Sequence, residues 1–113
     1  MIAVEGVLSA LADPTRRELL EHLSRQGRAT ATTLAAELPI SRQAVVQHLA
    51  VLDGVGLVAA RREGRERRFE VRTDPLTEVA RWMESLAAQW DGRLQAIRRI
   101  AESKGDGAPI RPL

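Results

Sequence analysis

The stretch Ser41 to Leu52, with the sequence SRQAVVQHLAVL, decides the fold. The hydroxyl of Ser41 can accept a hydrogen bond from an unpaired backbone N–H of the following turn, which predicts a helix N-cap. Val45, Leu49 and Leu52 then recur at intervals of four and three, as the buried stripe of a helix does. The opposite face of the first two turns carries Arg42, Gln43, Val46 and Gln47.

This outer face has the chemistry of a helix that contacts DNA bases. Arg and Gln are the side chains that make two-pronged contacts to guanine and adenine in the major groove. An ordinary amphipathic helix with a solvated face has the same pattern. The neighbouring segments therefore decide between the two interpretations.

Three helices are expected before this stretch. The apolar positions of residues 4–11 predict the first, and Asp13-Pro14 supplies the cap and first position of the second. Thr30 caps a third, short helix, which ends near Pro39. Two helices joined by a tight turn, the second with a polar outer face, have the layout of a helix-turn-helix.

A basic hairpin is expected after the helix. Residues 57–62 and 67–72 alternate as strands around Gly64, and such a hairpin after a helix-turn-helix is a wing. Residues 41–72 hold seven arginines against four acidic residues, which favours a surface that binds phosphate. A solvated charged hairpin is the alternative. The arginines expected to hold DNA are Arg62, Arg65, Arg67 and Arg68, with Arg65 at the tip near the minor groove.

Apolar residues in the last expected helix, residues 76–102, follow nearly coiled-coil spacing. This helix has more apolar surface than a small domain covers, so with the first helix it is the expected homodimer interface. The alternative to an interface is a ligand pocket lined by Trp82 and Trp90. The expected interface residues are Val4, Val7, Leu8, Leu11, Val79, Met83, Leu86, Trp90, Leu94 and Ile97.

Length and composition predict one domain over residues 1–102 and a flexible tail over residues 103–113. The 113 residues include no cysteine, so disulfides and thiolate metal sites are excluded and the cytoplasm is the expected location. The sequence has no run of about 18 apolar residues, so no membrane span is expected. The expected architecture is mostly α, with five helices and a two-stranded wing.

Four segments together resemble the ArsR/SmtB family of bacterial winged-helix repressors. They are residues 10–17 (ALADPTRR), residues 41–49 (SRQAVVQHL), residues 56–58 (GLV) and residues 62–65 (REGR). The resemblance implies a homodimer that binds an inverted-repeat operator and excludes polymerase. It also implies a structural or phosphate-facing role for His48. If the helix-turn-helix binds DNA, Thr30 and Ser41 are expected to anchor the DNA backbone together with the wing arginines.

Two departures from the family pattern stand out. Val46 replaces the usual small hydroxyl residue, so base preference does not carry over from relatives. The ligands of metal-sensing members are also missing, because there is no cysteine and the last helix has no histidine. The resemblance therefore favours a metal-independent branch, without a cofactor.

The predicted function is sequence-specific binding of double-stranded DNA by a homodimeric transcriptional repressor. A small organic molecule or a protein partner at the dimer seam is the expected effector. A winged-helix adaptor that binds proteins and not DNA is the alternative, since a fold alone does not determine function. Catalysis is not expected, because no nucleophile and base pair, no phosphate loop and no metal cluster is found.

Overall fold

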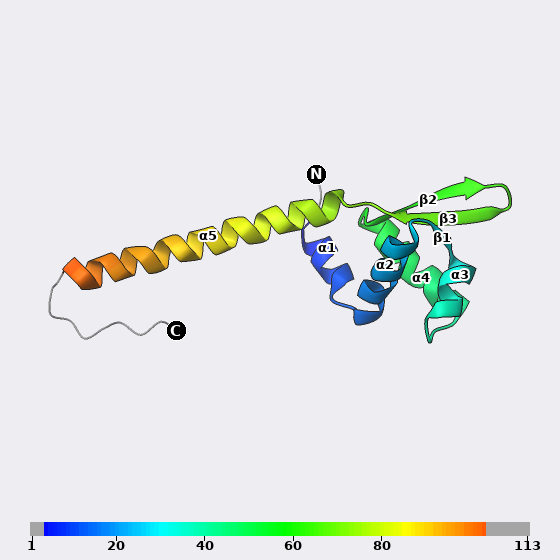
Figure 1. Cartoon of the computed structure of the whole chain (residues 1–113), viewed down its shortest axis with the longest axis horizontal. Coiled ribbons are helices and arrows are strands. Elements are labelled where there is room, and N and C mark those ends of the chain that lie inside the picture. The colour runs from blue at the N-terminus through cyan, green and yellow to red at the C-terminus, as the bar shows by residue number, and fades with distance from the viewer. Residues whose placement is uncertain (1–3, 104–113) are drawn as a thin grey trace. The chain divides into compact units, whose positions relative to one another are not determined.

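A computed structural model describes residues 4–103 of the chain (Figure 1). The expected tail, residues 103–113, lies outside the described residues except for Ser103. The helices are α1 (Val4–Leu11), α2 (Pro14–Gln26), α3 (Ala31–Glu37), α4 (Arg42–Gly54) and α5 (Asp74–Ser103); the strands are β1 (Ala29–Thr30), β2 (Val58–Glu63) and β3 (Glu66–Val71).

The chain forms two compact units. The first is Met1–Val79, and the second, Ala80–Leu113, contains the remainder of α5. The sequence predicts one domain over residues 1–102, and this boundary stays a prediction. No described helix is both long enough and apolar enough to cross a membrane.

Side-chain caps set the starts of three helices where the sequence predicts them. Asp13 Oδ1 accepts hydrogen bonds from the backbone N–H groups of Thr15 and Arg16, at 2.8 and 3.3 Å. Thr30 Oγ1 accepts from the N–H of Thr33 at 3.1 Å and starts α3. Each cap pairs a donor that the first turn of a helix leaves without a partner. Local sequence therefore determines the helix boundaries.

The sheet has three strands, in the order β1-β3-β2, and all neighbours are antiparallel. The two-stranded wing expected from the sequence is present as β2 and β3, and β1 adds a third strand beside β3. β1 has only two residues, and its Ala29 pairs with Phe69 of β3. A strand this short has no periodicity of its own, because only its partner defines it.

The turn of the hairpin is one residue shorter at each end than expected. Only Gly64 and Arg65 separate β2 from β3, and Glu63 pairs with Glu66. Gly64 has φ +64°, as the first position of a type II′ turn requires, and glycine adopts this conformation without strain.

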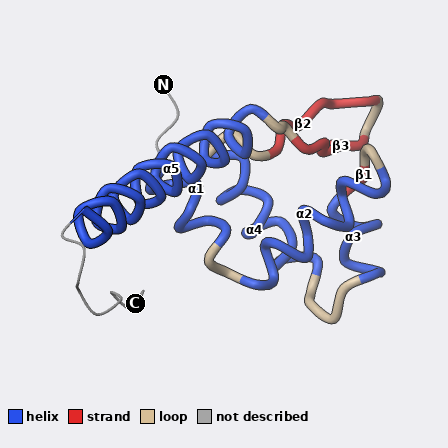
Figure 2. Tube along the Cα trace, turned by 60° about the vertical axis from the view of Figure 1, so that its left-hand side comes forward, coloured by secondary structure: helices blue, strands red, loops and turns tan. Residues whose placement is uncertain are grey.

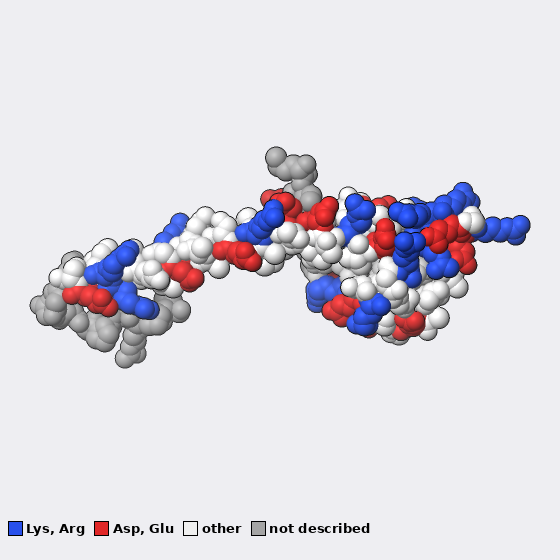
Figure 3. All heavy atoms as spheres, turned by 45° about the horizontal axis from the view of Figure 1, so that its top comes forward, with Lys and Arg blue, Asp and Glu red and all other residues white. Residues whose placement is uncertain are grey.

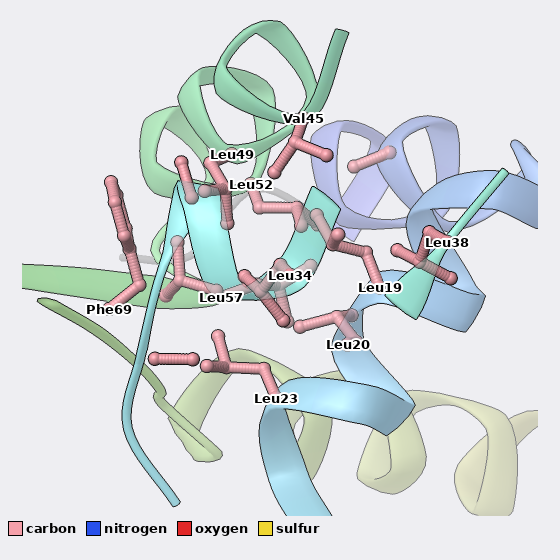
Figure 4. Close-up of a cluster of buried hydrophobic side chains, with 14 of the residues drawn as sticks. Leu19, Leu20, Leu23, Leu34, Leu38, Val45, Leu49, Leu52, Leu57 and Phe69 are labelled. Carbon is pink, nitrogen blue, oxygen red and sulfur yellow. The ribbon is translucent and has the colours of Figure 1, made fainter. Parts of the chain in front are cut away.

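One core holds the first unit together. Leucines from α2, α3 and α4 meet the inner face of the hairpin at Phe69, as Figure 4 shows. In Figures 1 and 2 these helices lie on one side of β2 and β3. The side chains that lie deepest are Leu19, Leu23, Leu34, Leu49, Leu52, Leu57, Val7, Val45 and Val58.

Asp13, the N-cap of α2 at its corner with α1, has a lowered pKa. Burial alone raises the pKa of Asp13, but the N–H groups of Arg16 and Thr15 and the charges of Arg16 and His48 outweigh it and lower the pKa below 3.8. A lowered carboxyl pKa stabilises the fold above the unfolded-state value, and this contribution is lost as the pH falls through the folded-state value.

Substitution Asp13→Asn tests this contribution. Asparagine also caps helices but does not titrate, so the variant keeps the cap and loses the pH-dependent part. We expect the stability difference between the parent and Asp13→Asn to shrink as the pH falls from 6 toward ~3. Urea denaturation at several pH values measures it, and a difference independent of pH contradicts the assignment.

Candidate nucleic-acid interface

The N-terminus of α4 is held by Ser41. Its Oγ accepts a hydrogen bond from the N–H of Ala44 at 3.1 Å, and its carbonyl oxygen accepts from Val45 at 3.0 Å. Ser41 itself is exposed. The first turn of α4, which carries Arg42 and Gln43, therefore has a fixed direction at the surface.

The inner stripe of α4 is buried as predicted. Val45, Leu49 and Leu52 are at most 1% exposed, and all belong to the core. Side chains on the opposite face are exposed, because a helix repeats every 3.6 residues. This group, which we call the outer face of α4, consists of Gln43, Val46, Gln47 and Ala50. Ala50 is an addition to the residues predicted from the sequence.

Arg42 lies at the edge of this outer face and contacts α3. Its Nε donates a hydrogen bond to Oγ1 of Thr32 at 3.0 Å. The two terminal nitrogens keep their donors for another partner. Sequence analysis missed Thr32; its only signal was its place in the threonine-rich first turn after Thr30. The contact holds the guanidinium group of Arg42 by its Nε.

His48 lies on the other flank of α4. It is half-buried, and its charge contributes to lowering the pKa of Asp13, at the N-cap of α2. Counting 100° per residue, His48 and Arg42 lie on opposite sides of the buried stripe. The geometry thus favours the structural role for His48 over a phosphate contact.

The two faces of the hairpin differ in charge. Directly paired residues share a face, and the pairs are Ala60 with Phe69, Arg61 with Arg68, and Arg62 with Arg67. The face that carries Phe69 into the core therefore carries Arg62 and Arg67 further out. We call this the inner face of the wing; the other is its outer face.

Acidic residues neutralise the outer face of the wing. Arg68 contacts Glu63 at 3.3 Å and Glu66 at 2.7 Å. Arg28 contacts the same Glu63 at 2.8 Å and Glu70 at 3.6 Å. Exposed ion pairs add little stability, but they occupy the cations. Arg68, which the sequence proposes as a phosphate ligand, is thus already paired.

The inner face of the wing keeps its positive charge. Arg62 and Arg67 oppose each other directly, and Arg67 lies over the ring of Phe69 at 5.4 Å from its centroid. Like charges directly opposed in a sheet are destabilising, and a bound anion relieves the repulsion. A shallow concavity here is lined by Ala60, Arg62, Arg65, Glu66 and Arg67. Figure 3 shows basic side chains gathered at the hairpin end, with acidic ones among them.

The apolar residues expected at the dimer interface divide into three groups. Val7 and Val79 are 0% and 3% exposed and belong to the core, so they offer no surface to a partner. Val4, Leu8 and Leu11 are half-buried against that core. The remaining five lie on α5 and are 42–55% exposed: Met83, Leu86, Trp90, Leu94 and Ile97.

The described residues hold no group of three His, Cys, Asp or Glu side chains placed to bind a metal ion. Nδ1 of His22 lies 3.2 Å from Oε2 of Glu37. Gln26 donates a hydrogen bond to the same oxygen. These three side chains link α2 to α3, so His22 has a structural partner.

Comparisons with known proteins agree with this geometry. Residues 11–61 match a family model described as a helix-turn-helix domain. The chain is 39% identical over 97 residues to the HTH-type transcriptional regulator Rv2034 of Mycobacterium tuberculosis (strain ATCC 25618 / H37Rv), covering 86% of this chain and 87% of that protein. It is also 35% identical over 91 residues to a probable mercury resistance operon repressor of Streptomyces lividans, covering 80% and 72%.

A solved structure extends the likeness to three dimensions. The ArsR-like transcriptional regulator from Rhodococcus sp. RHA1 superimposes with a TM-score of 0.80 at 43% sequence identity. The match covers 87% of this chain and 92% of that one. The similarity thus extends beyond residues 11–61, which the family model matches.

Proposed function

This chain belongs to the ArsR family of winged helix-turn-helix transcriptional regulators, and from that premise we propose that it acts in the cytoplasm as a homodimeric repressor. DNA binding and transcription regulation are the activities of the family, whose members are regulators and not enzymes. The proposal adds the dimer, an inverted-repeat operator and a response that does not use metal.

The observation that carries the proposal is that α4 and the wing each present exposed side chains suited to DNA. The outer face of α4 presents amides, methyl groups and the edge of Arg42, and the inner face of the wing presents unneutralised arginines. Amides and guanidinium groups suit base edges, whereas arginines outside the helix suit phosphates. On duplex DNA, helix and wing would dock together as in other winged helix-turn-helix proteins.

Exposed side chains of α5 support the dimer. Trp90 is 55% exposed and Leu86 is 42% exposed on one apolar stripe. Monomeric soluble proteins rarely leave so large a continuous apolar surface uncovered. A second copy of the chain, related by a twofold axis, would cover both stripes and present two copies of α4 to one operator.

The proposed response does not use thiolate chemistry. The relative from Streptomyces lividans is named for mercury resistance, and soft metal ions are bound best by thiolates. This chain has no cysteine, so it lacks that type of ligand. An organic molecule or a protein partner at the α5 seam fits the exposed tryptophans better, and would act by different affinities for DNA-competent and incompetent dimers.

Substitution of the wing arginines tests the phosphate contacts. Arg62→Ala removes a charge from the inner face of the wing and Arg61→Ala removes one from its outer face, at adjacent positions of β2. We expect Arg62→Ala to weaken binding to all duplexes and to reduce the slope of log K against log salt by about 0.9 for each chain, or about 1.8 for the proposed dimer. Arg61→Ala should leave the slope unchanged. Equal slopes for both variants contradict the assignment of the faces.

Substitution of Arg42 tests base contact. We expect Arg42→Ala to cost about 1–3 kcal/mol for each half-site of the preferred duplex and less on unrelated sequences, because a base contact distinguishes sequences and a phosphate contact does not. Mobility shifts on a duplex selected from a random library, with footprinting of the bound site, measure both quantities. An equal loss of affinity on all sequences would show that Arg42 contacts the DNA backbone and not a base.

A further inference from the structure

The outer face of α4 carries a row of methyl groups beside a row of two amides. Val46 and Ala50 are exposed and lie one turn apart, and Gln43 and Gln47 are exposed and also lie one turn apart. No charged side chain stands among these four. Arg42, the residue before Gln43, lies at the edge of the face, and its Nε donates a hydrogen bond to Thr32.

This chemistry selects among the four base pairs. Adenine offers N7 and its amino group to a glutamine amide, and thymine presents a C5 methyl group to an apolar side chain. Guanine is best bound by Arg or Lys, and the amino group of cytosine by a carboxylate. The outer face of α4 has no acidic or basic side chain, so its centre suits an A·T pair better than a G·C pair.

We propose that Val46, with Ala50 beside it, contacts the C5 methyl of a thymine in each half-site, next to an adenine bound by Gln43 or Gln47. The inference rests on the proposed function, because it requires α4 to enter the major groove. It adds the identity of the base pair at the centre of the contact. Val46 is 42% exposed without a partner, so the side chain has surface left to bury.

Deoxyuridine tests the methyl contact directly, since it pairs like thymidine and lacks only the C5 methyl. The probe is a duplex that the parent chain selects from a random library, resynthesised with deoxyuridine at single thymidine positions. We expect one position in each half-site to lower affinity about fourfold, and both together about fifteenfold. The selected sequences should hold A·T pairs at that position.

Val46→Ala and Val51→Ala form a matched pair of variants. Both valines lie on α4, and both are 42% exposed, but Val51 lies about 140° around the helix from Val46 and more than one turn further along it. Val46→Ala should bind the thymidine and deoxyuridine duplexes equally, whereas Val51→Ala should keep the parent's preference.

Several results would overturn the inference. If the parent bound every substituted duplex with equal affinity, the proposed methyl contact would be rejected. DNA binding, and so the proposed function, would still stand. A preference that survives in Val46→Ala would assign the contact to another residue. Failure to select any duplex would reject the proposed function and this inference together.

Discussion

Leu86→Glu combined with Leu94→Glu is expected to convert the proposed dimer into a monomer and to abolish operator binding. Both leucines are exposed on the apolar stripe of α5 in the single chain, at 42% and 44%, so the first unit should fold as before. Loss of a central interface side chain typically costs about 2 kcal/mol or more. Two such losses, with charges left buried, should weaken dimerisation at least about a thousandfold.

Ser85→Glu combined with Gln95→Glu is the matched control. It adds the same charge to the same helix but on the side away from the stripe. Sedimentation of each variant gives the mass, and a mobility shift gives the affinity for the selected duplex. If the Leu86 and Leu94 variant remains a dimer, α5 is not the interface. If it becomes a monomer and binds the full operator like the parent, the twofold account of recognition is wrong.

Leu49→Ala is expected to lower the free energy of unfolding by about 2–5 kcal/mol. Leu49 is 1% exposed and holds α4 against the core, so the truncation leaves a cavity that the surrounding side chains fill only in part. Small domains are stable by about 5–15 kcal/mol in total, so the change removes a large share. DNA affinity should fall with it, because α4 carries the outer face.

Val51→Ala again provides the control, since it truncates an exposed side chain of the same helix. A surface change of this kind should stay within about 0.5 kcal/mol. Urea denaturation at one fixed protein concentration compares the two variants, because dimerisation makes apparent stability depend on concentration. Equal midpoints for Leu49→Ala and Val51→Ala would contradict the assigned core.

Helix boundaries were predictable from the sequence because their causes are local. Asp13, Thr30 and Ser41 each bond to an N–H two or three residues ahead, so a short window contains both partners. The buried stripe of α4 was predictable for the same reason, since one helical period determines it. The winged helix-turn-helix fold expected from these elements is confirmed by the structure and by its ArsR-like neighbour.

Features that depend on distant pairing were not predictable. β1 exists because Ala29 meets Phe69, which lies forty residues further along the chain. The pairing of Arg68 follows from the same sheet, because the register places Glu63 and Arg28 near it. From the sequence alone, the wing arginines expected to hold DNA all have the same role, that of phosphate ligands. Only the register separates the neutral outer face of the wing from the basic inner face.

The most direct test of the central claim is the mass of the protein–DNA complex, measured by native mass spectrometry on the selected duplex. The account predicts two chains of 12.4 kDa on each duplex, with none bound singly at saturation. A complex that holds one chain at saturation, or no complex in dilute buffer, would contradict it.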